Sequence, residues 1–249
     1  MKTYFVNFLK IKKIFIAGLS FVLVALFLTA ALLKPDGILP AQSKPYPVYK
    51  VKTGKKVAAL TFNVSWGGKV AGPVLDALQK QDVKATFFVS GAWAKKYPEL
   101  AHRIGEEGHE IASNGNRQIN LSAETKATVQ DELKKSRELI QEATGHPPSL
   151  LRVPYGDWND TVLAEAAGLG YTVVQWSVDS LDIQTPGKNA VVNNVVNKVH
   201  PGAIILMHAS DTASQTPEAI PAIIEGLKNG GYELVTVSNL LKKGPGVID

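Results

Sequence analysis

The chain has 249 residues, a formal net charge of +5 at pH 7 and no cysteine. The lack of cysteine excludes disulfide bonds, cysteine zinc sites and thiol catalysis, and it fits an exported bacterial protein. Residues 1–56 hold ten lysines and one acidic residue, whereas residues 57–249 hold 17 Lys and Arg against 21 Asp and Glu. A slightly acidic domain without a clustered basic face argues against nucleic acid as its partner.

The first expected element is an apolar helix over residues 14–33. This run has no charged residue, and at a rise of ~1.5 Å per residue it crosses the ~30 Å core of a bilayer. Four lysines precede it, so we expect residues 1–13 to stay in the cytoplasm and all later residues to be exported. The alternative is a cleaved signal peptide, whose apolar region usually has only ~7–15 residues. The sequence favours a single-pass protein of the cell membrane with an extracytoplasmic domain.

The next segments divide the exported part by composition. Residues 34–56 contain four prolines with scattered lysine and glycine, which predicts an extended stalk. Residues 57–241 have the length of one domain and show no internal repeat, so we expect one hydrophobic core. Residues 242–249 are expected to form a C-terminal tail.

Short apolar runs alternate with longer amphipathic stretches in this domain. The expected strands are residues 57–62, 85–89, 171–176, 203–207 and 233–237. The expected helices are residues 70–81, 99–107, 123–144, 160–168, 189–199 and 217–229. Repeated strand-then-helix units predict an α/β fold with parallel strands covered by helices, and roughly six or seven units can close into a barrel. Functional side chains in such a barrel gather at the C-terminal ends of the strands.

Polar motifs follow these strand ends. They read Thr61-Phe62-Asn63-Val64-Ser65-Trp66-Gly67, Asn114-Gly115-Asn116-Arg117-Gln118, Arg152-Val153-Pro154-Tyr155-Gly156, Trp176-Ser177-Val178-Asp179-Ser180-Leu181-Asp182 and Leu206-Met207-His208. In order and context they resemble the five motifs of the polysaccharide deacetylase family, the NodB-homology domain of carbohydrate esterases, over residues 57–241. Residues 65–67 and 208–219 are similar to its PdaB-like sporulation branch.

The resemblance implies a distorted (β/α) barrel that removes acetyl groups from N-acetylated sugars in peptidoglycan or chitin. In the family, a divalent metal such as zinc, held by one Asp and two His, polarises the acetyl carbonyl and activates water. Another Asp accepts a proton, and a late His donates one to the leaving amine. The expected partner of this chain is therefore cell-wall glycan.

Four positions of this chain depart from the family pattern. Asn63 stands where the family has its basic Asp, and an amide has no basic lone pair at neutral pH. Val64 stands at the Asp ligand of the metal, and an isopropyl group cannot coordinate a cation. Asn114 and Gln118 stand at the two His ligands, and neutral amides are weak ligands for zinc. We therefore predict no catalytic metal at this site.

Other family positions are kept. Arg152 and Tyr155 match the third motif, Asp179 and Asp182 match the fourth, and His208 matches the fifth. The resemblance implies that one of the two Asp residues orients His208, which would serve as the general acid. The sequence does not decide which Asp does so. Ile183 replaces the usual Trp beside them.

Each candidate also has a structural interpretation. His208 could be a hydrogen-bonded core residue at a strand end. Arg152 could form a buried ion pair with Asp179 or Asp182. Trp66 could stack on a sugar ring or simply pack, and Trp93, Trp158 and Trp176 are expected to pack. A serine hydrolase built on Ser210 and Asp211 is rejected because no Gly-x-Ser-x-Gly elbow occurs. The remaining histidines, His102, His109, His146 and His200, are expected at the surface or at helix ends.

The sequence thus predicts a membrane-anchored member of the deacetylase family that faces peptidoglycan, made during sporulation, with weak or absent metal-dependent deacetylation. A second hypothesis is a non-catalytic glycan-binding or assembly protein on the same fold. A third hypothesis, metal-free deacetylation supported by His208 and an Asp, lacks any group that would activate the nucleophile. Binding of glycan without metal would favour the second hypothesis over the first.

Overall fold

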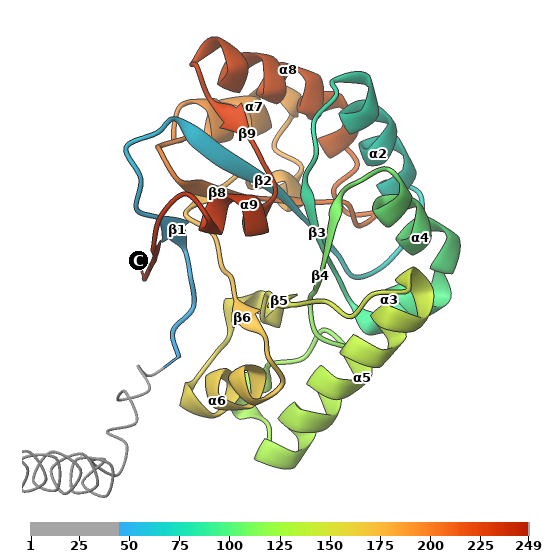
Figure 1. The fold of residues 1–249 in the computed structure, drawn as a ribbon. Coiled ribbons are helices and arrows are strands. Elements are labelled where there is room, and N and C mark those ends of the chain that lie inside the picture. Colours follow the sequence, from blue (N-terminus) through green and yellow to red (C-terminus); the bar gives the residue numbers. More distant parts are fainter. Residues whose placement is uncertain (1–44, 249) are drawn as a thin grey trace, which may run out of the picture. The chain divides into compact units, whose positions relative to one another are not determined.

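The computed structural model describes residues 45–248, which form one compact unit (Figure 1). The expected anchor at residues 14–33 and the first part of the expected stalk lie outside these residues. Within residues 45–248, no helix is both long enough and apolar enough to cross a membrane.

The centre of the fold is a set of parallel strands. β2 (Val57–Val64) pairs with β8 (Ala203–His208) on one side and with β3 (Thr86–Val89) on the other, and β4 (Glu110–Ser113) follows β3. Side chains of β2 alternate between two core clusters, because successive residues of a strand point to opposite faces. Both faces of β2 are therefore covered, which explains its nearly continuous apolar sequence.

The curled sheet continues beyond β4 through two short strands. β5 (Leu150–Leu151) pairs with β4, and β6 (Thr172–Val173) pairs with β5. The same stretch of chain continues into β7 (Val178–Asp179), which pairs with β8. Residues 172–179 therefore join the far edge of the sheet to β8. The α/β fold with a curled, mostly parallel sheet agrees with the expectation from the sequence.

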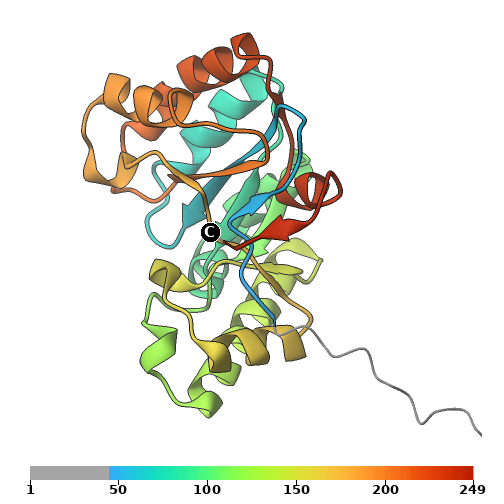
Figure 2. The same ribbon diagram turned by 90° about the vertical axis from the view of Figure 1, so that its left-hand side faces the viewer.

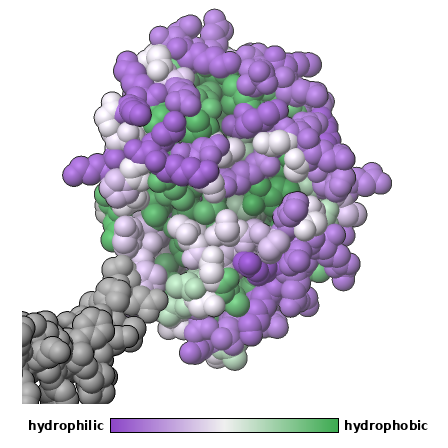
Figure 3. Space-filling view, in the orientation of Figure 1, coloured by the Kyte–Doolittle hydropathy of each residue, from purple (hydrophilic) through white to green (hydrophobic). Residues whose placement is uncertain are grey.

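Helices cover the outside of the curled sheet (Figures 1 and 2). They are α2 (Ala71–Lys80), α3 (Gly91–Lys96), α4 (Pro98–Glu106), α5 (Lys126–Thr144), α6 (Asp160–Gly168), α7 (Lys188–Val196), α8 (Thr216–Asn229) and α9 (Val237–Leu241). Their caps follow the sequence: the Thr125 hydroxyl accepts from the Thr128 N–H at the start of α5, and Gly145 ends it in the left-handed region. Hydrophilic residues dominate the helical exterior in Figure 3.

The two ends of the described chain pair with each other. β1 (Lys50–Val51) runs antiparallel to β10 (Gly246–Val247) and to the first residue of β8. Val48 bridges to Val174, and Val48 and Val51 are buried. Residues 45–56 therefore belong to the folded unit, although their prolines and lysines predict a stalk. Residues 246–247 likewise form a strand within the expected tail, because each segment supplies the other's hydrogen-bond partners.

Most expected strands and helices are present with ends shifted by a few residues. β4, β5, β7 and α3 were not predicted from the sequence. The expected strand at residues 233–237 is shorter: β9 (Glu233–Leu234) pairs with β2, and α9 begins at Val237.

Candidate active site

A cleft of about 430 Å³ opens at the C-terminal ends of the strands. Its described lining consists of Asn63, Ser65, Trp66, Asn114, Gln118, Tyr155, Gly156, Trp176, Ile183, Leu206, His208 and Ser210. The lining brings together residues from all five sequence motifs. It includes amides, hydroxyls and aromatic rings but no Asp, Glu, Lys or Arg among the described residues.

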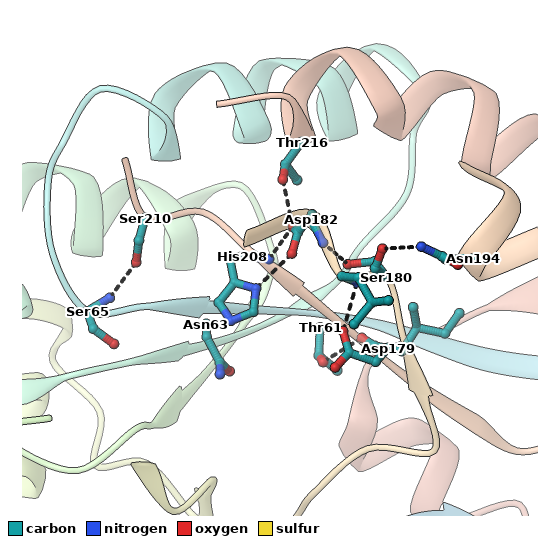
Figure 4. A network of polar contacts seen from close by, with 12 residues as sticks. Thr61, Asn63, Ser65, Asp179, Ser180, Asp182, Asn194, His208, Ser210 and Thr216 are labelled. Atoms are coloured by element: carbon teal, nitrogen blue, oxygen red, sulfur yellow. Dashed lines mark hydrogen bonds and ion pairs between the residues drawn. The ribbon is translucent and has the colours of Figure 1, made fainter. Parts of the chain in front are cut away.

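His208 is held by a buried carboxylate. Oδ1 of Asp182 lies 2.8 Å from Nδ1 of His208, and Oδ2 accepts from the His208 backbone N–H at 2.7 Å. The Thr216 hydroxyl donates to the same Oδ2 at 2.6 Å, as Figure 4 shows. Asp182 is fully buried, while the His208 side chain keeps 15% of its surface exposed. Because Nδ1 is engaged by Asp182, Nε2 is the ring nitrogen left for a ligand in the cleft.

The structure distinguishes the two aspartates of the fourth motif. Asp179 Oδ1 accepts from the Leu181 backbone N–H at 2.8 Å, and this bond holds the turn that leads to Asp182. Asp182 is therefore the residue that orients His208, and Asp179 stabilises the turn. Leu181 adopts a left-handed backbone with φ of 56°, a conformation that a residue with a side chain seldom takes.

Arg152 is fully buried beneath the cleft, among neutral oxygens. Nη1 donates to Thr61 Oγ1 at 2.9 Å and to Asn63 Oδ1 at 3.0 Å, and Nη2 donates to the Gln175 carbonyl at 3.0 Å. The guanidinium also lies 4.0 Å from the centre of the Phe88 ring. Burial lowers the pKa of Arg152 to about 9, and the charge of Asp179 opposes part of this change. The suggested ion pair with an Asp is thus replaced by contacts to neutral acceptors.

Amides fill the two positions where the family has histidines. Asn114 Oδ1 accepts from Gln118 Nε2 at 3.1 Å and from the Ser65 hydroxyl at 3.1 Å. Asn114 Nδ2 donates to the Arg152 carbonyl at 2.9 Å. The acceptor and donor of Asn114 are therefore both used within the protein.

Val64 lies outside the cleft. Its side chain is fully buried in the main core cluster with Phe62, whereas Asn63, the residue before it, lines the cleft. The alternation of the strand explains this difference, because β2 continues through Val64.

Exposed apolar side chains surround the cleft. Trp66 is 51% exposed, Tyr155 is 68% exposed and Ile183 is 46% exposed. The Tyr155 hydroxyl donates to the Gln118 carbonyl at 3.3 Å, and its backbone has φ of 60°. Trp176 also lines the cleft and packs against Gly156, where a Cβ would come within 3.1 Å of its ring. Trp176 packs against the core cluster that contains Val57 and Ala59, as expected, and it also lines the cleft, while Trp93 is buried and donates to the Gly67 carbonyl at 2.6 Å.

Ser210 and Asp211 position the loop after β2. The Ser65 N–H donates to Ser210 Oγ at 3.0 Å, and Asp211 Oδ1 accepts from the Lys69 and Val70 N–H groups at 2.8 and 3.2 Å. Gly67 is required here, because a Cβ would meet the Asp211 carboxylate at 2.1 Å. These contacts give Ser210 and Asp211 a structural role and agree with the rejection of a serine hydrolase.

A family model described as polysaccharide deacetylase matches residues 50–174. The peptidoglycan-N-acetylmuramic acid deacetylase PdaA of Bacillus subtilis is 34% identical over 197 residues, which are 78% of this chain and 74% of PdaA. The chain belongs to the polysaccharide deacetylase family. The structure of a CE4 family pseudoenzyme from Bacillus anthracis is also similar, with a TM-score of 0.76 and 32% identity over 80% of this chain and 70% of that one.

Some curated relatives are considerably longer. The peptidoglycan-N-acetylglucosamine deacetylase PgdA of Listeria monocytogenes is 35% identical over 202 residues, which are 81% of this chain but 42% of PgdA. The chain thus spans about two fifths of the length of that relative.

The residues of this chain do not fit the metal of the polysaccharide deacetylase family. A dication needs ligands that offset its charge, and the cleft offers amide oxygens that already accept hydrogen bonds from neighbouring side chains. Val64 brings no donor atom and faces the core. No group of three or more His, Cys, Asp or Glu suited to a metal occurs in residues 45–248. We therefore derive no chemical step through a metal.

Several residues that line or shape the cleft were not expected from the sequence. Ser65 and Ser210 join the site through a hydrogen bond that connects two loops distant in sequence, which no local pattern indicates.

The interpretation of His109 as a surface or capping residue is wrong. His109 is buried at the start of β4, and its Nδ1 accepts from the Ala85 N–H at 3.2 Å.

Proposed function

We propose that the cleft binds N-acetylated cell-wall glycan, with peptidoglycan as the polymer, and that metal-dependent deacetylation by this protein is weak or absent. The single observation behind this proposal is the amide network at the metal and base positions: Ser65 and Gln118 both donate to Asn114 Oδ1, and Arg152 donates to Asn63 Oδ1. These side chains are suited to hydrogen bonds with hydroxyl and acetamido groups, and they are poorly suited to Lewis-acid chemistry.

The aromatic rim supports a glycan as the ligand. Trp66 and Tyr155 expose ring faces beside an uncharged lining, and such rings can stack against the apolar faces of sugars. The names of the relatives also point to peptidoglycan, because PdaA and PgdA are peptidoglycan deacetylases.

His208 and Asp182, the part of the family's catalytic machinery that this chain keeps, are insufficient for hydrolysis by themselves. His208 held by Asp182 can donate or accept a proton at Nε2. No carboxylate lines the described part of the cleft to activate water, because Asn63 replaces the base. A metal-free reaction would need another source for several kcal/mol of transition-state stabilisation.

The location and timing of the protein are part of the proposal. Residues 14–33 would anchor the chain in the cell membrane with its N-terminus in the cytoplasm, as their length and lack of charge indicate. The similarity of residues 65–67 and 208–219 to the PdaB-like branch suggests a role in sporulation.

A non-catalytic glycan-binding or assembly protein is the second candidate. The observation that favours it is Val64, which has no donor atom and is buried in the core at the position where the family has a metal ligand. The two candidates differ only in whether any acetate is released.

The test combines calorimetric binding with acetate release, using the full chain and oligosaccharides of N-acetylglucosamine, with and without a chelator. We expect binding that the chelator does not change, and a loss of about tenfold in affinity for Trp66→Ala, a value typical of one aromatic contact. Tyr46→Ala is the matched control, since Tyr46 is exposed but does not line the cleft. Stoichiometric zinc together with acetate release that His208→Ala abolishes would overturn the proposal.

A second variant tests the metal positions directly. Asn63→Asp, Val64→Asp, Asn114→His and Gln118→His together restore the family pattern. We expect zinc binding to appear in this variant, because two histidines and a carboxylate then replace side chains that cannot offset the charge of the metal. Absence of zinc binding in a folded variant would contradict the assignment of these four positions.

A further inference from the structure

Lysines are concentrated at the end of the sheet opposite the cleft. Residues 45–56, 198–202 and 230–249 together contain seven lysines and two acidic residues, whereas the rest of residues 45–249 contain 14 Lys and Arg against 19 Asp and Glu. We call this surface the basic face. Its exposed lysines are Lys52, Lys55, Lys56, Lys198, Lys242 and Lys243.

Strand pairing brings these segments together. Lys50 of β1 pairs with Ala203 of β8 and with Val247 of β10, and the Glu233 N–H donates to the Lys56 carbonyl at 2.9 Å. Among the described residues, Glu233 lies 3.9 Å from Lys243, and Glu110 accepts from the Ser238 backbone N–H at 3.2 Å. Residues 50–56, which precede the slightly acidic segment 57–249, supply four of the seven lysines of this face.

The basic face and the cleft lie at opposite ends of the same strands. β2 begins beside Lys56 and ends at the cleft, and β8 runs in the same direction from Ala203 to His208. At roughly 3.3 Å per residue, the eight residues of β2 span about 25 Å. Figure 2 looks towards β1 and the C-terminal end of the chain, which lie side by side at this end.

Exposed apolar side chains accompany the lysines. The large hydrophobic side chains exposed in residues 45–248 are five, and three of them surround the cleft. The other two, Tyr46 and Ile248, flank β1 and β10 at the basic face, and the Tyr46 hydroxyl donates to the Gly246 carbonyl at 3.3 Å. Tyrosine and aliphatic side chains beside lysines are typical of surfaces that meet lipid headgroups.

The position at which the folded unit begins also indicates a lipid surface as the partner. The folded unit begins at Pro45, next to Tyr46, and residues 34–44 connect it to the apolar run at residues 14–33. Eleven residues reach at most about 40 Å when fully extended. With the proposed anchor in a bilayer, this short connection keeps Tyr46 and its neighbours near the lipid.

We propose that the basic face binds an anionic lipid surface and so directs the cleft away from the membrane. This interaction is separate from glycan binding in the cleft. Lysine ammonium groups would contact phosphate headgroups, and Tyr46 and Ile248 would enter the interfacial layer. The contact should weaken as salt is raised, because the screening length falls to about 10 Å at 0.1 M.

The test measures how fast individual lysines are acetylated in the full chain mixed with lipid vesicles, using mass spectrometry. The vesicles contain phosphatidylcholine alone or phosphatidylcholine with phosphatidylglycerol. We expect Lys52, Lys55, Lys198 and Lys242 to react about fivefold more slowly only when phosphatidylglycerol is present, as expected for lysines held at an anionic surface. Lys95 and Lys188, which are exposed elsewhere, are internal controls and should react equally in both.

A charge-removing variant and a competing polymer complete the experiment. Lys52→Gln, Lys55→Gln and Lys242→Gln together should abolish the protection of Lys198 without changing glycan affinity, whereas Lys95→Gln, Lys134→Gln and Lys188→Gln should leave it intact. Equal reaction rates in the two kinds of vesicle would overturn the proposal. Equal protection by soluble poly(glycerol phosphate) without anionic lipid would also overturn it, and would identify an anionic polymer as the partner instead.

Discussion

The two ends of the curled sheet each hold a histidine, in opposite surroundings. At the cleft, His208 is oriented by Asp182, which also bonds to Thr216. At the other end, His109 is buried beside Phe87, with Nδ1 bonded to a backbone N–H and Nε2 without a hydrogen-bond partner. Burial and the charge of Lys84 lower the pKa of His109 to about 4, so it is neutral at pH 7. Burial and a nearby lysine thus keep His109 neutral at pH 7, whereas His208 bonds to Asp182 and borders the cleft.

The same contrast separates the two sides of the cleft. One side keeps a carboxylate and an imidazole in the arrangement of the polysaccharide deacetylase family. The other side has exchanged charged groups for amides that satisfy one another, and Arg152 is left with neutral acceptors. The cleft thus keeps its shape without the charges that a metal would need.

The largest expected effect is the loss of the Asp182 carboxylate. Asp182→Ala should lower the free energy of unfolding by about 4 kcal/mol, because it leaves a buried backbone N–H, a hydroxyl and an imidazole without their acceptor. Urea denaturation at pH 7 measures this change. Asp179→Ala is the matched control and should cost about 2 kcal/mol, since Asp179 accepts one loop hydrogen bond and its charge offsets part of that of buried Arg152. Equal losses in the two variants would contradict the assignment of Asp182 as the central group.

The second effect concerns His109 and acid. In the unfolded chain His109 gains a proton below about pH 6.5, but in the folded protein only near pH 4. Stability should therefore fall by about 3 kcal/mol through this group as the pH drops from 6.5 to 4. His109→Asn keeps an acceptor for the Ala85 N–H and should flatten that part of the curve. Identical pH profiles of unfolding for the variant and the parent would show that His109 does not contribute.

The smallest expected effect comes from restoring one carboxylate on the side of the cleft that is lined by amides. Asn63→Asp places a negative charge beside Nη1 of Arg152 and should raise the free energy of unfolding at pH 7 by about 1 kcal/mol. This gain should disappear as the pH falls through the pKa of the introduced carboxyl group, which Arg152 would hold below its ordinary value. Asn114→Asp is the control with the opposite sign, because it loses the bond to the Arg152 carbonyl. Thermal unfolding at several pH values measures the stability of both variants. Stabilisation by Asn114→Asp would contradict the described contacts.

The sequence predicts those parts of the fold whose signals are local. β2, β8 and the long helices have apolar patterns that determine their type, and their ends lie within a few residues of expectation. β1 and β10 have two residues each and exist because they pair with each other, so no local pattern indicates them. Proline and lysine in residues 45–56 predict a stalk, but tertiary pairing overrides that preference.

The sequence predicts which residues meet in the cleft better than it predicts the hydrogen bonds between them. The five motifs named the residues that meet in the cleft, including Asn63, Asn114 and His208. The choice between Asp179 and Asp182 depends on a turn with a left-handed Leu181, which spacing does not reveal. The hydrogen bond between Ser65 and Ser210 likewise requires the fold to be known.

The pairing of β1 with β10 has a consequence for how the chain folds. Almost the whole domain lies between these two strands in the sequence, so their contact closes a very long loop and is costly to form early. We expect the parallel strands and their helices to assemble first and the pairing of β1 with β10 to form last. A force applied to the chain at residue 45 would reverse that order. The backbone hydrogen bonds of residues 48–52 would then break one after another. The paired ends of the chain would then be the first part of the domain to open under mechanical load.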